Sequence, residues 1–136
     1  MGTSKGGTCA IYYGLELRAV HVFSGACQYY IGNYLNNDND KPILRGMLGD
    51  DYTQKDLDEL NKAVCKQFEK YKDNGTVIHL LYSEDEPTYP EHTVHLLRDL
   101  EKWGVPYTAN VEHFTNHNDI GRFFIPYIRN EISKLM

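Results

Sequence analysis

The feature that most restricts the fold of this 136-residue chain is a nearly continuous apolar run at residues 76–82, T-V-I-H-L-L-Y. The run contains β-branched residues and no regular alternation between apolar and polar positions. It therefore predicts a strand that is buried on both faces, which is typical of the middle of a parallel sheet. Parallel strands need crossover connections, usually helices. The run thus predicts an α/β protein.

Two more strands are predicted, at residues 19–23 and 107–111, and the three strands should lie side by side in chain order. A short helix is expected at residues 8–17, before the first of them. Residues 26–52 are aromatic-rich and then rich in Asn and Asp. They predict an excursion over the sheet edge, where either ligand contacts are made or aromatic side chains only pack on the core.

Three later helices follow from the periodicity of apolar residues. The first begins at the N-cap Thr53, with Asp56 completing a capping box, and one apolar stripe is expected to continue to Tyr71. The second begins at Pro90 and ends at Gly104, and it is expected to bury Val94, Leu97, Leu100 and Trp103. The last is lined by Phe124, Ile128, Ile132 and Leu135, with a kink or a delayed start at Pro126.

Length and composition indicate one domain over residues 1–136. The net charge is −5 and no basic cluster is present, which argues against a nucleic-acid partner. No apolar run is long enough to predict a membrane span, and no signal peptide is evident. Cys9, Cys27 and Cys65 are widely spaced and odd in number, which favours reduced thiols and a cytoplasmic protein.

The N-terminal residues 2–7 form the motif G-x-S-x-G-G and open the first helix. This pattern is typical of a tight turn between a strand and a helix, which leaves the Ser4 hydroxyl exposed as a nucleophile. The glycines allow a close backbone approach, and free N–H groups at the helix start can hold an oxyanion. The alternative is a flexible, glycine-rich terminus in which Ser4 is only a turn residue.

Acids and histidines follow the next two predicted turns. Glu84, Asp85 and Glu86 come directly after the strand at residues 76–82, although three consecutive acids could also form a solvated turn. His113 and His117 come after the last strand. A serine nucleophile needs a base, and the base needs an acid to orient it.

The remaining histidines are interpreted as structural, because they fall within predicted strands or on a helix: His21, His79, His92 and His95. The spacing of His92 and His95, and of His113 and His117, would suit a metal. Neither pair has an accompanying thiolate or carboxylate at a recognised spacing, so neither a metal site nor a cofactor is expected.

The order of serine turn, acid and histidine resembles the C-terminal half of an α/β-hydrolase. Residues 84–92, E-D-E-P-T-Y-P-E-H, resemble the acid turn of that superfamily, in which the acid stands four residues before a proline. This implies Glu86 as the acid, with Asp85 and then Glu84 as alternatives. Residues 100–117 are similar to the run that leads to the catalytic histidine, which implies His117, with His113 as the alternative. The backbone N–H of Lys5 would be the oxyanion donor.

A narrower resemblance rests on G-T-S-K-G-G-T-C-A-I-Y-Y-G-L and Q-Y-Y-I-G-N-Y-L. These segments resemble capsular polysaccharide biosynthesis proteins of the XcbB/CpsF type and the acetyltransferase-like component of the accessory Sec system. The resemblance implies serine-dependent acyl transfer, either hydrolysis of a small-molecule or glycan ester or movement of an acyl group to or from a sugar. The alternative it leaves open is a non-catalytic, hydrolase-like binding module in a glycan-assembly or export complex.

One departure from the superfamily pattern concerns the N-terminal strands, because only Met1 precedes Gly2. The elbow strand and the strands before it are expected to be absent, which would leave an open sheet edge at residues 19–23. An open edge predicts self-association, or association with an N-terminal half supplied separately. It also predicts weak hydrolase activity for the chain alone.

Overall fold

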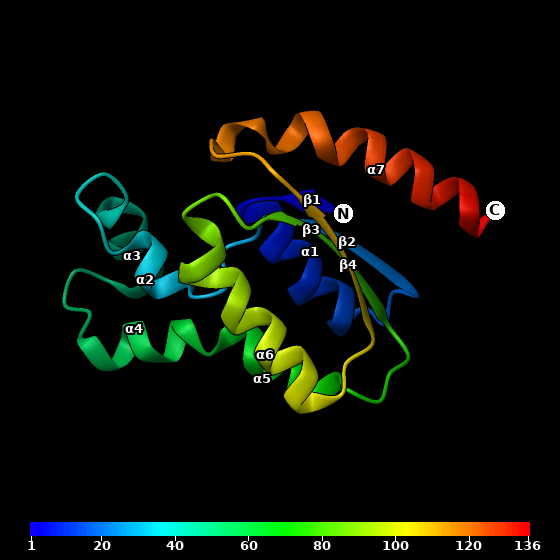
Figure 1. Cartoon of the computed structure of the whole chain (residues 1–136). Helices are drawn as coiled ribbons and strands as arrows, with labels where there is room; N and C mark the ends of the chain where they lie inside the picture. The colour runs from blue at the N-terminus through cyan, green and yellow to red at the C-terminus, as the bar shows by residue number, and fades with distance from the viewer.

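A computed structural model describes all residues, 1–136 (Figure 1). In chain order the elements are β1 (Gly2–Thr3), α1 (Lys5–Glu16), β2 (His21–Gly25), α2 (Ile31–Leu35), α3 (Lys41–Leu48), α4 (Gln54–Asn61), α5 (Ala63–Tyr71), β3 (Val77–Ser83), the π-helical turn η1 (Tyr89–Thr93), α6 (Val94–Trp103), β4 (Tyr107–Glu112), the 3-10 turn η2 (His117–Asp119) and α7 (Ile120–Leu135).

The four strands form one parallel sheet in the order β1-β2-β3-β4. The α/β class and the side-by-side order of the three predicted strands are therefore confirmed. The register places His21 of β2 opposite Val77 of β3, and Ile78 of β3 opposite Tyr107 of β4. In a parallel sheet all strands end at one edge, so the loops after them meet there.

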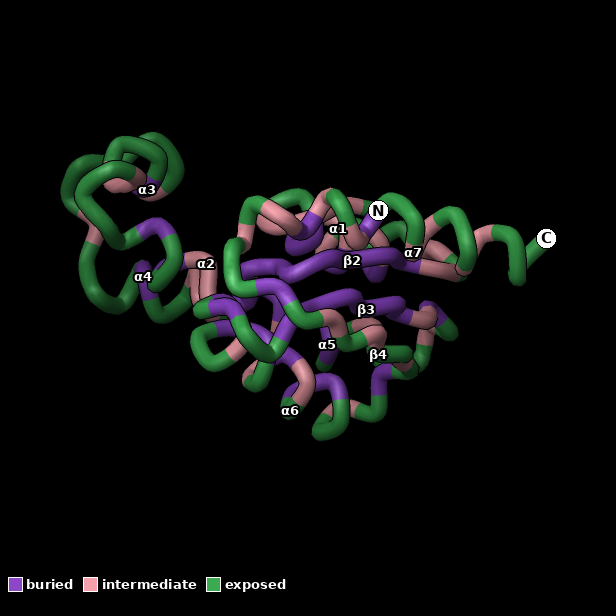
Figure 2. The backbone as a smooth tube through the Cα atoms, turned by 45° about the horizontal axis from the view of Figure 1, so that its top comes forward, coloured by how far each residue is buried: buried purple, intermediate pink, exposed green.

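Helices cover both faces of the sheet, which gives three layers (Figure 1). The alternation of side chains along β3, which packs on both faces, explains why its sequence is largely apolar. Ile78, Leu80 and Tyr82 belong to the larger core, which α1, α5 and α6 complete. Leu81 faces the opposite way and packs with Phe124 of α7. Figure 2 shows β2 and β3 as the buried centre of the molecule.

The N-terminus corrects the expectation that the elbow strand is absent. Gly2 and Thr3 form a two-residue strand that pairs with Ser24 and Gly25 at the end of β2. Two paired residues are enough to anchor the turn to the sheet, because the turn at Ser4 begins directly after Thr3. The rest of the β2 edge, at residues 21–23, has no strand partner in the sheet.

Three helical expectations are corrected. The predicted single helix beginning at Thr53 is two helices, α4 and α5, which meet at Lys62. α7 begins at Ile120, six residues before Pro126, so the delayed start is wrong. Val94 is exposed and Leu96 is buried in its place, because the π-helical turn before α6 rotates the face that packs on the sheet. The capping box of Thr53 and Asp56 is confirmed.

The excursion at residues 26–52 contains the helices α2 and α3, which the sequence analysis did not predict. With α4 they form a lobe to one side of the sheet (Figure 1). The lobe has a small hydrophobic core of its own, which is formed by Leu35, Leu44 and Leu57. No helix of the structure combines the length and the hydrophobicity needed to cross a membrane.

Candidate active site

Four side chains meet where the strands of the sheet end. Ser4 follows β1, Gln28 follows β2, Glu86 follows β3 and His117 follows β4. Each lies within four residues of the strand before it except His117, which the η2 turn carries. The carboxyl edge of a parallel sheet is the usual position of a functional site in this class of fold.

Ser4 has the strained backbone of a tight turn, with φ 53° and ψ −127°. A non-glycine residue with positive φ is held only where its surroundings enforce the conformation. Here the Ser4 N–H donates to the Gly25 carbonyl at 2.8 Å, and the Ser4 carbonyl accepts from Gly7 N–H at 2.9 Å. These bonds anchor the turn between β1 and α1 and leave the hydroxyl projecting from the sheet edge.

Two glycines make this turn possible by close approach. A Cβ on Gly2 would lie 2.3 Å from the Gly6 carbonyl oxygen, and a Cβ on Gly7 would lie 2.7 Å from the Ser24 hydroxyl. Gly6, the last glycine of the G-x-S-x-G pattern, has no atom within 4 Å of such a Cβ. The expected close packing therefore applies to Gly2 and Gly7 and not to Gly6.

Ser4, His117 and Glu86 form a hydrogen-bonded chain. Ser4 Oγ lies 3.0 Å from His117 Nε2, and His117 Nδ1 lies 2.6 Å from Glu86 Oε2. Because a carboxylate only accepts hydrogen bonds, the imidazole proton lies on Nδ1, which leaves Nε2 as an acceptor for the serine hydroxyl. Thr88 Oγ1 lies 3.2 Å from the same Nδ1. The arrangement has the geometry of a base that can remove the Ser4 proton.

Glu86 is buried, with 2 % of its surface exposed. Its second oxygen, Oε1, has no hydrogen-bond partner in the chain. The interaction of the carboxylate is therefore concentrated on His117, in a region where water screens it little. A carboxylate in this position stabilises the imidazolium that forms when the histidine takes a proton.

Gln28 was not singled out from the sequence, yet its side chain is part of this site. Its Nε2 donates to Ser4 Oγ at 2.8 Å and lies 3.5 Å from His117 Nε2. The Thr8 hydroxyl donates to the Gln28 carbonyl at 2.7 Å, and Gln28 is 3 % exposed, so the amide is held in place. Its position just after β2 was the available signal, because the other three site residues follow strands in the same way.

Asp85 and His113, the alternative acid and histidine from the sequence, form a separate pair. Asp85 Oδ2 lies 3.0 Å from His113 Nδ1, both side chains are exposed, and no hydrogen bond joins either to Ser4. Glu84 is exposed as well. Asp85 and Glu86 are neighbours in one turn, yet only Glu86 points inward to His117.

Lys5 is the first residue of α1, so its backbone N–H has no acceptor within the helix. This N–H lies directly after the serine, at the positive end of the helix dipole. Beside it is an apolar cavity of about 170 Å³. The lining residues come from α1 and from the lobe: Lys5, Thr8, Cys9, Gln28, Ile31, Tyr34, Leu35, Ile43 and Met47.

Two of the remaining histidines, His21 and His79, form a pair of their own. His21 Nδ1 is 2.9 Å from His79 Nε2, and His79 Nδ1 is 2.9 Å from the Thr108 hydroxyl. Burial lowers the pKa of His79. The structure brings together no group of three or more His, Cys, Asp or Glu side chains that could hold a metal ion.

No protein-family model and no curated protein sequence matches this chain. Solved structures do match. The capsule O-acetyltransferase of Neisseria meningitidis serogroup A has a TM-score of 0.80 at 19 % identity, over 97 % of this chain and 55 % of its own. A ferulic acid esterase has a TM-score of 0.61 at 15 % identity, over 90 % of this chain and 48 % of its own. This chain has an α/β-hydrolase-like fold.

The glycosylation-associated Gap123 complex from Streptococcus agalactiae contains a similar chain, with a TM-score of 0.72 at 19 % identity. That match covers 97 % of this chain and 28 % of the other. This hydrolase-like chain spans about half the length of the acetyltransferase and the esterase that it matches. The structural neighbours thus include a capsule O-acetyltransferase and a glycosylation-associated complex, which agrees with the narrower sequence resemblance.

Proposed function

We propose that the chain carries the catalytic centre of a serine-dependent acyl-transfer enzyme, an esterase or an O-acyltransferase. The observation that carries the proposal is the hydrogen-bonded chain from Ser4 through His117 to the buried Glu86. The strained backbone of Ser4 supports it, because such conformations cluster at functional positions. The acetyltransferase and esterase folds of the neighbours support the same class of reaction.

In the proposed reaction, Ser4 Oγ attacks the carbonyl carbon of an acyl donor as His117 Nε2 takes the hydroxyl proton. The oxyanion that forms accepts a hydrogen bond from the Lys5 N–H. When the carbonyl re-forms, the bond to the leaving group breaks, and His117 returns its proton to that group. A water molecule or a sugar hydroxyl then gives its proton to His117 and attacks the acyl-serine. The bond from Ser4 Oγ to the acyl carbon breaks, and His117 returns the proton to Ser4 Oγ.

We further propose that the acceptor or ester substrate is a surface glycan or a capsule-related compound, by analogy with the capsule O-acetyltransferase of similar fold. No cofactor takes part in this scheme, and no contact with nucleic acid is proposed. A cytoplasmic location is part of the proposal, supported by three cysteines that form no disulfide. The proposal also includes a partner: a second copy of the chain, or a separate N-terminal half, would associate through the edge of β2.

A second candidate function is a binding module without catalysis, and the match to the Gap123 complex favours it. A hydrolase-like scaffold in such a complex would retain the fold and use its surface for assembly. The two candidates differ in whether Ser4 is activated, which a chemical probe can measure.

The test is covalent labelling with a fluorophosphonate probe, which reacts only with an activated serine. The natural chain should be labelled, and both labelling and turnover of p-nitrophenyl acetate should fall by at least about a thousandfold in Ser4→Ala. Ser133→Ala is the matched control, because Ser133 is an exposed serine on α7. A folded natural chain that takes up no label would favour the binding module.

A further inference from the structure

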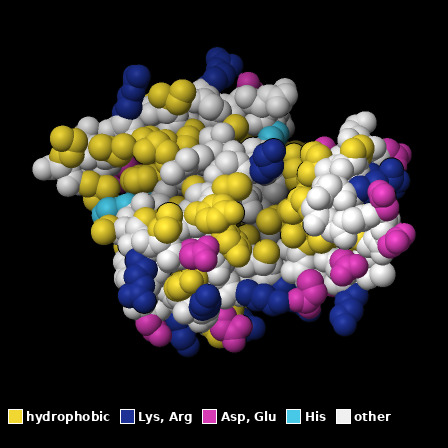
Figure 3. All heavy atoms as spheres, turned by 180° about the vertical axis from the view of Figure 1, so that it is seen from behind, with side chains coloured by type: hydrophobic (Ala, Val, Ile, Leu, Met, Phe, Trp, Pro, Cys, Tyr) yellow, Lys and Arg dark blue, Asp and Glu magenta, His cyan; other side chains and the backbone are white.

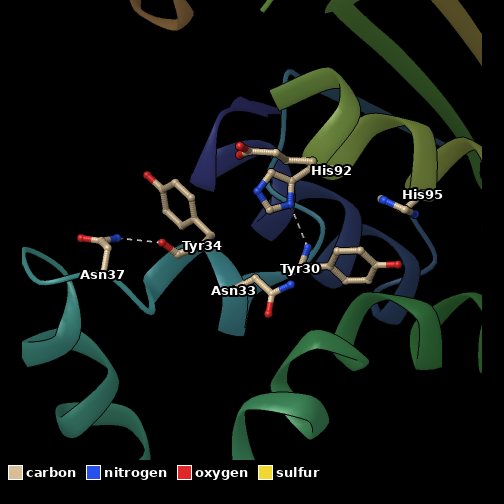
Figure 4. Close-up of a pocket in the computed structure, with 7 residues that line it drawn as sticks. Tyr30, Asn33, Tyr34, Asn37, His92 and His95 are labelled. Carbon is tan, nitrogen blue, oxygen red and sulfur yellow. Dashed lines mark hydrogen bonds between the residues drawn. The ribbon is translucent and has the colours of Figure 1, made fainter. Parts of the chain in front are cut away.

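The largest cavity of the molecule adjoins the apolar one next to Lys5, because Tyr34 lines both, but its other lining residues are different. Its volume is about 560 Å³. The lobe contributes one wall, and the start of the π-helical turn and of α6 contributes the other (Figure 4). The lining is mostly polar and aromatic: Tyr30, Asn33, Tyr34, Asn37, Glu91, His92 and His95.

His92 presents a fixed donor to this cavity. Its side chain is buried, with 4 % of the residue exposed, and Nδ1 accepts hydrogen bonds from the N–H groups of Tyr29 at 3.2 Å and Tyr30 at 3.1 Å. Burial lowers the pKa of His92 to about 4. The ring is therefore neutral near pH 7 and its proton must lie on Nε2, because Nδ1 is an acceptor.

Nε2 of His92 has no partner within the chain. The hydrogen bonds of this side chain all use Nδ1. In Figure 4 the other ring nitrogen lies on the side of Tyr34, toward the open part of the cavity. A buried ring held by two backbone groups, with its one N–H aimed at a cavity, is a preorganised donor for a ligand.

The other lining groups complement this donor. The Glu91 carboxylate is exposed and makes no salt bridge, so it can accept hydrogen bonds. Asn33 Oδ1 accepts from Asn61 Nδ2 at 2.9 Å, which leaves the Asn33 NH₂ group free to donate. The rings of Tyr30 and Tyr34 supply flat apolar surfaces with a polar end.

Charge decides what kind of ligand such a cavity favours. The lining contains a carboxylate and neither lysine nor arginine, so a phosphate or another anion would be repelled. The nearby Arg98 donates to Asp99 at 2.9 and 3.2 Å, which balances its charge. Its guanidinium also contacts Tyr30 Oη at 3.3 Å and His95 Nδ1 at 3.2 Å. A neutral ligand with several hydroxyl groups can donate to Glu91, accept from His92 and lay its C–H face on a tyrosine ring.

We infer that this cavity binds a neutral sugar unit of the glycan on which the proposed acyl transfer acts. The inference rests on the proposed function for its substrate and on the cavity itself for the site. Two segments join the cavity to the reacting serine. In the first, Gln28 contacts Ser4, and Tyr30, two residues later, lines the cavity. In the second, Thr88 contacts His117, and Glu91, three residues later, lines the cavity. A sugar held here would present a neighbouring hydroxyl or ester toward Ser4.

The test is NMR titration of the ¹⁵N-labelled chain with methyl glycosides of glucose, galactose, N-acetylglucosamine and N-acetylmannosamine. At least one glycoside should bind saturably in the millimolar range and shift the His92 and Asn33 side-chain signals. Binding should weaken by about tenfold in Glu91→Ala, which loses a charge-assisted hydrogen bond. The matched control is Glu69→Ala, an exposed glutamate on α5. Tyr34→Ala should weaken binding similarly, and Tyr13→Ala, an exposed tyrosine on α1, should not.

The outcomes separate this inference from the proposed function. Ser4→Ala should bind the glycoside as the natural chain does, although it cannot be labelled by a fluorophosphonate. A chain that is labelled and binds no glycoside, or binds adenosine in the cavity instead, would overturn the inference alone. A chain that binds the glycoside and is not labelled would overturn the acyl-transfer proposal and leave the sugar site standing.

Discussion

At the scale of single residues, Gln28 is the side chain whose role is most open to measurement. Its Nε2 donates to Ser4 Oγ at 2.8 Å, and its Oε1 lies 3.1 Å from the same hydroxyl. We expect Gln28→Leu to keep the fold and to lower the rate of fluorophosphonate labelling by about a hundredfold, as for the loss of one fixed donor at a reacting centre. In acyl-transfer assays the loss should appear in kcat more than in KM.

The matched control is Gln67→Leu, because Gln67 is also buried and donates its amide to a backbone carbonyl, that of Tyr12, at 3.2 Å. It should lower stability without changing the labelling rate per folded molecule. Equal labelling of the natural chain and Gln28→Leu would show that the amide only fills space beside Ser4.

His92 predicts how stability depends on pH. Its pKa is lowered from 6.5 to about 4 in the folded chain, because burial penalises the charged ring. Above pH 6.5 the ring is neutral in both the folded and the unfolded chain, so the stability of the fold is not reduced by protonation of His92. As the pH falls toward 4, the unfolded chain binds the proton first, and the free energy of unfolding drops by up to about 3 kcal/mol.

The measurement is urea denaturation at a series of pH values between 7 and 4, for the natural chain and for His92→Gln. The variant should lose a large part of the pH dependence in this window, and the remainder should include His79, whose pKa is lowered in the same direction. His95→Gln serves as the control, because His95 lies three residues later, at the start of α6, and is less buried. Parallel pH profiles for His92→Gln and the natural chain would contradict the assignment.

At the scale of elements, the turn between β1 and α1 depends on Gly7 more than on its neighbour Gly6. A Cβ on Gly7 would lie 2.7 Å from Ser24 Oγ and 3.0 Å from Cys27 Cβ, whereas a Cβ on Gly6 would meet nothing within 4 Å. We therefore expect Gly7→Ala to lower the free energy of unfolding by about 1–3 kcal/mol, the usual cost of overpacking. Gly6→Ala should raise it by about 0.5–1 kcal/mol, because alanine favours the helix.

Thermal and urea denaturation of both variants provide the check, since the two substitutions make the same chemical change one residue apart. If Gly6→Ala destabilised the chain as much as Gly7→Ala, flexibility of the turn, rather than close packing, would explain the glycines.

At the scale of the whole molecule, residues 21–23 of β2 have no strand partner on the side of β1, although Val22 and Phe23 are themselves buried. β1 covers only Ser24 and Gly25, and Val20, just before β2, is 69 % exposed. Figure 3 views the molecule from behind, on the side of β1 and β2, and shows hydrophobic side chains gathered across the middle of that face. We expect the chain to self-associate with increasing concentration, because an uncovered strand edge is a template for pairing.

Sedimentation velocity of the natural chain and of Val20→Lys tests this expectation. A charge at the edge should shift the chain toward monomer. Val94→Lys is the control, because Val94 is also exposed but lies on α6, away from this edge. A natural chain that stays monomeric at all concentrations would show that the short β1 and the surrounding side chains protect the edge.

Several features followed from the sequence alone. The nearly continuous apolar run at residues 76–82 predicted the central strand, since a strand buried on both faces favours apolar residues on both. The parallel order of the strands followed from the helices between them. Ser4 was found from the G-x-S-x-G-G motif at residues 2–7. The acids after β3 and the histidines after β4 were found because each group follows a predicted strand, and strand ends meet at one edge.

Other features were decided only by the tertiary structure. Local sequence does not say which of two adjacent acids turns inward; here Glu86 is buried against His117 and Asp85 is exposed with His113. The amide of Gln28 is polar and unremarkable in the sequence, and it belongs to the site only because β1 and β2 are neighbours. Such choices depend on which surfaces exclude water once the sheet and its helices have packed, and this is a property of contacts between residues far apart in the chain.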